Sequence, residues 1–308
     1  MKTTTMLARV RAYLAQRRAL GFRLQSEGNL LLEFARYTDR SRHRGHLTKK
    51  LAITWASLPS GVDHLYWARR LEVVRTFAKH LAITDPQTEL PPRHVFGPAH
   101  RGPRPFIYSA GQIAQILEAA GQLPGKLQPS SFQTLFRLLA CTGLRISEAL
   151  RLKVADVDFS QGMLVVRGSK FGRTRWVPLH STASNALQVY ARKRQGLFPL
   201  TDHFFTSDRG RRLGYQAARK VFAKLRKLLA IEGRQPRIHD FRHAFACRVL
   251  QRWQAQRNGA QSRVIILSRY LGHSRISDTY WYLQALPELT AEAGRRFEHF
   301  PYENHRPE

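Results

Sequence analysis

The stretch LGHSRISDTYWYL, residues 271–283, holds one histidine, His273, and two tyrosines, Tyr280 and Tyr282, on either side of a tryptophan. The pair Gly272-His273 indicates a turn that leads into a helix. Successive helical residues are rotated by about 100°, so the two tyrosines point roughly 200° apart and cannot both face one substrate. The stretch therefore predicts a short helix with one tyrosine available for chemistry and the other for packing or surface contact.

The composition of the chain is that of a globular protein. Its 308 residues, 43% of them hydrophobic, suffice for two domains, each with its own core. No apolar run is long enough to span a membrane, and the arginine-rich start is not a secretory signal. The only two cysteines, Cys141 and Cys247, lie in apolar, helix-like stretches. We expect them to be buried free thiols in a reducing cytoplasm.

The charge of the chain indicates a polyanionic partner. Lysines and arginines number 51 against 21 acidic residues, a formal net charge of +30. Nucleic acid is the usual partner of such a surface. An anionic membrane is the rival, but the basic residues run along the whole chain and form no amphipathic anchor. The charge favours a nucleic-acid-binding protein and carries no information about catalysis.

The sequence divides into two domains and a linker. Apolar stripes with three- and four-residue steps predict a helical bundle in residues 1–84, with Ser26 and Thr48 as helix N-caps. Residues 85–107 are rich in proline and read as an extended linker. Residues 108–308 form the second domain, which opens on Ser109 and a capping-box spacing.

The second domain is predicted to be mainly helical, with one small β-hairpin. Residues 163–168 and 174–179 are two β-type runs joined by a short turn. Helical patterns cover residues 183–195, 214–231, 240–255, 262–271 and 278–285, and a tail helix covers 289–300. The predicted fold class is thus mainly α with a small sheet (α+β).

Four separated pieces carry residues suited to phosphate chemistry. Arg145 follows a helix-ending glycine in TGLRISEAL, and Lys170 stands at the hairpin tip. In IHDFRHAFA, His239 and Arg242 share a helical face, with His243 beside it. Arginine forks can hold phosphate oxygens, lysine and histidine can move protons, and surrounding positive charge favours a tyrosine phenolate. Each piece alone is weak evidence.

Taken together, TGLRISEAL, GSKFGRTRWVPL, HDFRHAFA and LGHSRISDTYWY resemble the boxes of the tyrosine recombinase (integrase) family, in the family's order, over residues 107–285. The resemblance implies a helical core-binding domain and a catalytic domain that together clamp duplex DNA. It implies no cofactor and no metal. It also implies a dimer on each site, a tetramer in the synapse, partner recombinases in some systems, and a cytoplasmic, nucleoid-associated location.

The resemblance also implies a role for each residue. Tyr282 attacks the scissile phosphate and forms a 3′-phosphotyrosyl bond, which a 5′-hydroxyl later reverses. Arg145 and Arg242 hold the non-bridging oxygens. Lys170 protonates the leaving oxygen, His239 assists proton transfer, and His273 binds the phosphate. Glu148, three residues after Arg145, is expected to orient groups of the site.

Some features depart from the family pattern or stay open. The insert at 251–263 has no assigned role, and Lys170 is followed by Phe171 rather than by glycine. Leu-Gln-Ala after Tyr282 favours a mobile-element integrase over a chromosome-dimer resolvase. In this family the C-terminal segment often docks on a neighbouring protomer. The alternatives are a type IB topoisomerase and a non-catalytic accessory paralogue.

Overall fold

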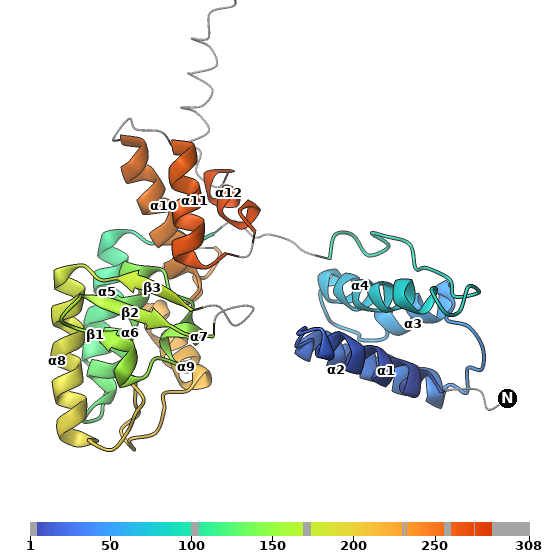
Figure 1. The fold of residues 1–308 in the computed structure, drawn as a ribbon, viewed down its shortest axis with the longest axis horizontal. Coiled ribbons are helices and arrows are strands. Elements are labelled where there is room, and N and C mark those ends of the chain that lie inside the picture. Colours follow the sequence, from blue (N-terminus) through green and yellow to red (C-terminus); the bar gives the residue numbers. More distant parts are fainter. Residues whose placement is uncertain are drawn as a thin grey trace, which may run out of the picture. The chain divides into compact units, whose positions relative to one another are not determined.

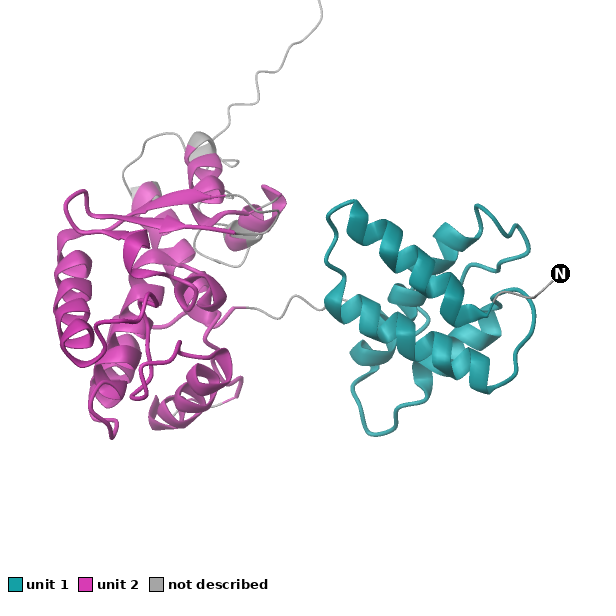
Figure 2. Cartoon of the chain, turned by 60° about the horizontal axis from the view of Figure 1, so that its bottom comes forward, with its two compact units in different colours: residues 1–103 teal, residues 104–308 magenta. Residues whose placement is uncertain are grey.

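The computed structural model describes residues 5–99, 105–168, 174–229, 231, 233–255, 260–273 and 275–284. The chain divides into two compact units, residues 1–103 and residues 104–308 (Figure 2). Each unit has its own hydrophobic core.

The described part of the first unit is helical, with α1 (Met6–Ala19), α2 (Gln25–Arg40), α3 (Lys49–Ser57) and α4 (His64–Leu81) (Figure 1). The predicted stripes form its core, in which Val10, Phe34 and Val74 are fully buried. Thr48 caps α3 as predicted, since its hydroxyl accepts from the backbone N–H of Leu51 at 3.2 Å. The Ser26 prediction is wrong, because α2 begins at Gln25 with Leu24 as its N-cap, in a left-handed conformation, and Ser26 lies inside the helix.

Much of the proline-rich segment belongs to the first unit and is held on its helical part. The backbone N–H of Glu89 donates to the carbonyl of Leu47 at 2.8 Å, and Arg9 forms an ion pair with Asp85 at 3.0 Å. Further along, the Phe96 ring makes an edge contact with Trp67. Residues 85–96 are thus held by backbone, charged and aromatic contacts, and are not an extended linker over this length.

The second unit opens with three helices, α5 (Ala110–Gly121), α6 (Gln128–Thr142) and the short α7 (Ile146–Ala149). Ser109 caps α5 in the predicted capping box. A three-stranded antiparallel sheet follows, formed by β1 (Val157–Asp158), β2 (Met163–Val166) and β3 (Arg175–Pro178) in the order β1-β2-β3. The predicted hairpin is confirmed, with Val165 opposite Trp176. Sequence reasoning missed the two-residue β1.

The remaining helices are α8 (Ser181–Leu197), α9 (Tyr215–Leu225), α10 (Asp240–Ala255), α11 (Ala260–Leu271) and α12 (Ser277–Gln284). Short 3-10 turns cover Val154–Asp156 and Arg226–Leu229. The predicted helix 214–231 therefore passes into a tighter turn after Leu225. The fold class, mainly α with a small sheet, is confirmed.

Helices α10, α11 and α12 gather at one end of the second unit and share a small core that contains Tyr282 (Figure 1). Of the polar insert, residues 251–255 extend α10 and residues 260–263 begin α11. The predicted tail helix, 289–300, lies outside the described residues.

The structure also tests two other expectations. No helix in the described part of the chain is long and apolar enough to cross a membrane. Cys247 is buried, but Cys141 is exposed. The prediction of two buried thiols is wrong for Cys141.

Candidate active site

Arg145 is placed by a tight turn between α6 and α7. Gly143 ends α6 with a positive φ of 63°, and a Cβ at this position would lie 2.5 Å from the Phe245 ring. The turn makes Arg145 the N-cap residue of α7. Its guanidinium donates to Glu148 Oε1 at 2.9 Å and to the carbonyl of Gly272 at 3.1 Å. Arg145 is thus fixed between α7 and the turn after α11.

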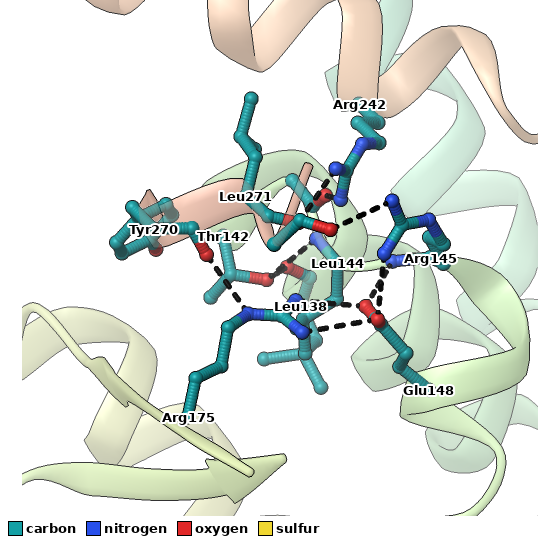
Figure 3. Close-up of polar contacts among 11 residues, drawn as sticks. Leu138, Thr142, Leu144, Arg145, Glu148, Arg175, Arg242, Tyr270 and Leu271 are labelled. Atoms are coloured by element: carbon teal, nitrogen blue, oxygen red, sulfur yellow. Dashed lines mark hydrogen bonds and ion pairs between the residues drawn. The ribbon is translucent and has the colours of Figure 1, made fainter. Parts of the chain in front are cut away.

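Glu148 is a buried carboxylate shared by two arginines (Figure 3). Arg175, on β3, makes a bidentate contact with it, at 3.0 Å to Oε1 and 2.8 Å to Oε2. Burial alone would raise the pKa of Glu148, but the hydrogen bond and charge of Arg175, together with Arg145, lower it to about 2. Glu148 is therefore ionised at neutral pH and neutralises part of the charge of the site.

Arg242 lies in the first turn of α10 and is almost fully buried. It donates to the carbonyl of Gly143 at 2.9 Å and to that of Leu271 at 2.6 Å. Burial, reinforced by the charge of Arg145, lowers its pKa to about 10. Arg242 still carries its full charge at neutral pH, so it is a third cationic guanidinium group in this site, beside Arg145 and Arg175.

The last two carbonyls of α11 and the carbonyl of Gly272, which follows it, connect these arginines. The oxygens of Tyr270, Leu271 and Gly272 accept hydrogen bonds from Arg175, Arg242 and Arg145, respectively. The C-terminal carbonyls of a helix lack partners within the helix and carry partial negative charge. The end of α11 is therefore a common attachment point for three cationic side chains from three different elements.

The two tyrosines of α12 have opposite environments. Tyr282 is only 2% exposed, whereas Tyr280 is 42% exposed. The Tyr282 ring lies 5.4 Å from that of His243 and 6.0 Å from that of His273, between centroids. Burial raises its pKa, and the charge and hydrogen bond of Arg242 partly offset this effect. The phenol that faces the arginines is therefore that of Tyr282.

Three histidines of the site are uncharged at neutral pH. Loss of solvation, with the charge of Arg242, lowers the pKa of His239 to about 4, although the residue is exposed over part of its surface, and that of His273 to about 3. Burial and the neighbouring His239 lower the pKa of His243 to about 4. The Nδ1 atom of His273 is 2.7 Å from the hydroxyl of Thr279. Neutral imidazoles of this kind can accept a proton.

Five of the six predicted site residues meet in one region of the second unit, and the structure describes all five: Arg145, His239, Arg242, His273 and Tyr282. The sixth, Lys170, lies outside the described residues. Sequence reasoning gave no role to Arg175, because an arginine in a half-buried strand has no distinctive signal.

Comparison with known proteins gave one family and a consistent set of relatives. The model of the phage integrase family matches residues 108–288. The chain is 38% identical to the putative integrase/recombinase y4rB of Sinorhizobium fredii, over 96% of this chain and 98% of that one. It is 32% identical to tyrosine recombinase XerD of Brucella abortus, over 72% of each chain.

Solved structures share the fold. The integrase of the Tn1549 transposon, in complex with transposon right-end DNA, matches with a TM-score of 0.71 and 17% identity over 95% of this chain and 99% of that chain. The XerH site-specific recombinase, bound to its difH substrate, matches with a TM-score of 0.66 and 16% identity over 89% of this chain and 80% of that chain.

Proposed function

Since the chain belongs to the phage integrase family and is a tyrosine recombinase that cuts and rejoins DNA, we propose that it acts through a 3′-phosphotyrosyl intermediate on Tyr282. The observation that carries the proposal is the position of this phenol. It is hydrogen-bonded to Arg242, lies between two neutral histidines, and shares a site with Arg145. Tyr280, exposed on the same helix, has no such surroundings.

The proposed first step is an in-line displacement at phosphorus. The Tyr282 oxygen forms a bond to the scissile phosphate, the bond to the 5′-oxygen breaks, and that oxygen leaves as a hydroxyl. Negative charge increases on the non-bridging oxygens in the transition state, and preorganised donors are most effective there. Arg145 and Arg242 are the donors proposed for these oxygens.

Two proton transfers accompany this displacement. The raised pKa of Tyr282 keeps it a protonated phenol at neutral pH, so a base must remove its proton as it attacks. His239, which is uncharged at neutral pH, is proposed to assist this transfer. Lys170 is the proposed donor to the leaving 5′-oxygen. His273 is proposed to contact the phosphate, oriented by its contact with Thr279.

The biological setting that we propose is integration or excision of a mobile element. The name of the y4rB relative joins integrase and recombinase, and the Tn1549 protein is a transposon integrase. The Leu-Gln-Ala sequence after Tyr282 supports the same assignment. A dimer on each duplex site and a tetramer in the synapse are proposed for the assembly, with duplex DNA as partner.

The proposed function is tested by covalent trapping. The full chain is incubated with a pool of duplexes that carry a randomised core and a nick, so that cleavage releases a short fragment and religation is blocked. A protein–DNA adduct that survives denaturation supports the proposal, and sequencing of the trapped DNA gives the crossover site. DNA binding without any adduct would instead identify a non-catalytic accessory protein.

A further inference from the structure

Arg175 is bonded to protein through every nitrogen of its guanidinium group. Its Nε donates to the carbonyl of Tyr270 at 2.9 Å, and its Nη1 and Nη2 donate to the two oxygens of Glu148 (Figure 3). Its side chain is 12% exposed, compared with 27% for Arg145. Arg175 is therefore directed at the protein, and Arg145 is the more accessible of the two.

Glu148 accepts four hydrogen bonds from these two arginines. Arg175 supplies two, and Arg145 supplies two more, from its backbone N–H at 3.0 Å and from Nη1 at 2.9 Å. The second Nη of Arg145 is bound elsewhere, to the carbonyl of Gly272. Glu148 therefore holds Arg145 through a single guanidinium nitrogen, and the bidentate position is occupied by Arg175.

Removal of Arg175 would change how the Glu148 carboxylate is shared between the two arginines. A buried carboxylate that loses a partner is costly unless another cation takes its place. Planar guanidinium and carboxylate groups prefer the bidentate arrangement. Arg145 is the cation within reach, and a second bond to Glu148 would turn its Nη2 away from Gly272. The guanidinium N–H groups of Arg145 would then bind Glu148 and would not be available to the phosphate.

The close packing around Gly272 supports the same role. Gly272 has a positive φ of 67°, and a Cβ there would lie 2.9 Å from Nη1 of Arg175. The Arg175 guanidinium thus fits against backbone at the turn that leads into His273. A single side chain contacts both the carboxylate that holds Arg145 and the segment that positions His273.

We propose that Arg175 is a positioning residue, which neutralises Glu148 and so leaves Arg145 available to the scissile phosphate. The inference rests on the proposed function, because it assigns Arg145 to that phosphate. Arg175 itself touches no substrate. Arg175 affects cleavage through Glu148. Substitution of Glu148 should therefore change how much the cleavage rate falls when Arg175 is removed.

The test is a double-mutant cycle with Arg175→Gln and Glu148→Gln in the full chain. The nicked duplex obtained by covalent trapping is the substrate, and the single-turnover rate of adduct formation is measured. Affinity is measured separately, in a Tyr282→Phe background. We expect Arg175→Gln to slow adduct formation about 100-fold, the effect of losing one preorganised charge contact, with DNA affinity nearly unchanged.

Addition of Glu148→Gln to Arg175→Gln should restore the rate by about tenfold, because no uncompensated carboxylate remains to hold Arg145. A purely structural role for Arg175 predicts the opposite, since a second lost contact would slow the reaction further. A double variant no faster than Arg175→Gln overturns the inference. Arg167→Gln is the matched control, because Arg167 pairs with Asp156 at 2.6 Å beside the same hairpin and should leave the rate unchanged.

If Arg175→Gln does not fold, as judged by thermal unfolding, Arg175→Lys takes its place in the same cycle. Lysine keeps a charge beside Glu148 but cannot make the bidentate contact. A slowed Lys variant whose rate recovers with Glu148→Gln supports the inference, and one that does not recover contradicts it. A wild-type chain that forms no adduct overturns the proposed function and the inference together. Equal rates in wild type and variants overturn the inference alone.

Discussion

The ring of Tyr282 is stacked on that of His273, with the ring planes inclined by 19° and the centroids 6.0 Å apart. The two residues lie nine positions apart in the sequence, on either side of the turn that leads into α12. The packing fixes the phenol relative to the histidine proposed to contact the phosphate. Tyr280, on the exposed side of the same helix, has no comparable contact with His273.

Tyr282→Phe should abolish the covalent adduct with nicked duplex, because the only proposed nucleophilic oxygen is removed. DNA binding should change little, since the buried phenol contributes no surface charge. Denaturing electrophoresis measures the adduct, and a mobility shift measures binding. Tyr280→Phe is the matched control on the same helix and should retain the adduct. An adduct formed by the Tyr282 variant would refute the assignment.

Arg145→Ala and Arg242→Ala should both slow cleavage by a factor of about 100 or more. They should differ in stability, however. Loss of Arg242 leaves the carbonyls of Gly143 and Leu271 without a donor, and each such group costs about 1–3 kcal/mol. Substitution of Arg145, which is more exposed, should lower the free energy of unfolding by less. Single-turnover cleavage and denaturant unfolding separate the two effects, and equal losses of stability would contradict this account of Arg242.

The DNA-free protein should lose stability as the pH falls from 7 to 5. His243 and His273 have folded pKa values of about 4 and 3, below the value of about 6.5 expected in the unfolded chain, so the unfolded state takes up protons first. Their contribution is fully present above pH 6.5 and is lost as the pH falls toward 4. Glu148, whose pKa is lowered from 4.5 to about 2, keeps its contribution between pH 7 and pH 5.

His243→Gln should reduce that loss by about 1–2 kcal/mol at pH 5, because one of the protonating groups has been removed. Chemical unfolding of wild type and variant at pH 7 and pH 5 gives the four free energies. The comparison at pH 7 corrects for packing lost by the substitution itself. A pH dependence identical in both proteins would show that His243 does not titrate as described.

DNA binding should weaken steeply with salt. The chain carries a net charge of +30, and cationic contacts with phosphates release counterions on binding. A plot of log affinity against log salt concentration should be linear with a slope well below −1. A slope near zero would contradict phosphate-dominated binding. The Tyr282→Phe variant is suited to this measurement, because it cannot divert DNA into the adduct.

The sequence predicted those parts of the fold that depend on local pattern. The stripe containing Val10, the capping box at Ser109 and the hairpin of β2 and β3 follow from residue periodicity and capping chemistry, which act over a few residues. The α2 cap at Ser26 was wrong because a left-handed Leu24 starts that helix without any side-chain cap. Nothing in the local pattern distinguishes the two starts.

The site was only partly predictable, because its decisive contacts span the chain. Arg145, His239, Arg242 and Tyr282 stand in recognisable boxes. The place of Arg175 depends on contacts with Glu148 and with a carbonyl 95 residues away, and no periodicity encodes such a contact. The burial of part of the proline-rich segment against the first unit was missed for the same reason.

The three arginines at the end of α11 also determine when the site can exist during synthesis. Gly272 lies 127 residues after Arg145, and Leu271 lies 29 residues after Arg242. Contacts between residues so far apart in the sequence require closure of a long loop, which costs entropy. A nascent chain still lacking α11 has its catalytic arginines but no carbonyls to hold them. The capacity to break DNA thus arises only once the chain has been made at least as far as the end of α11, and a product truncated before this helix lacks the preorganised site.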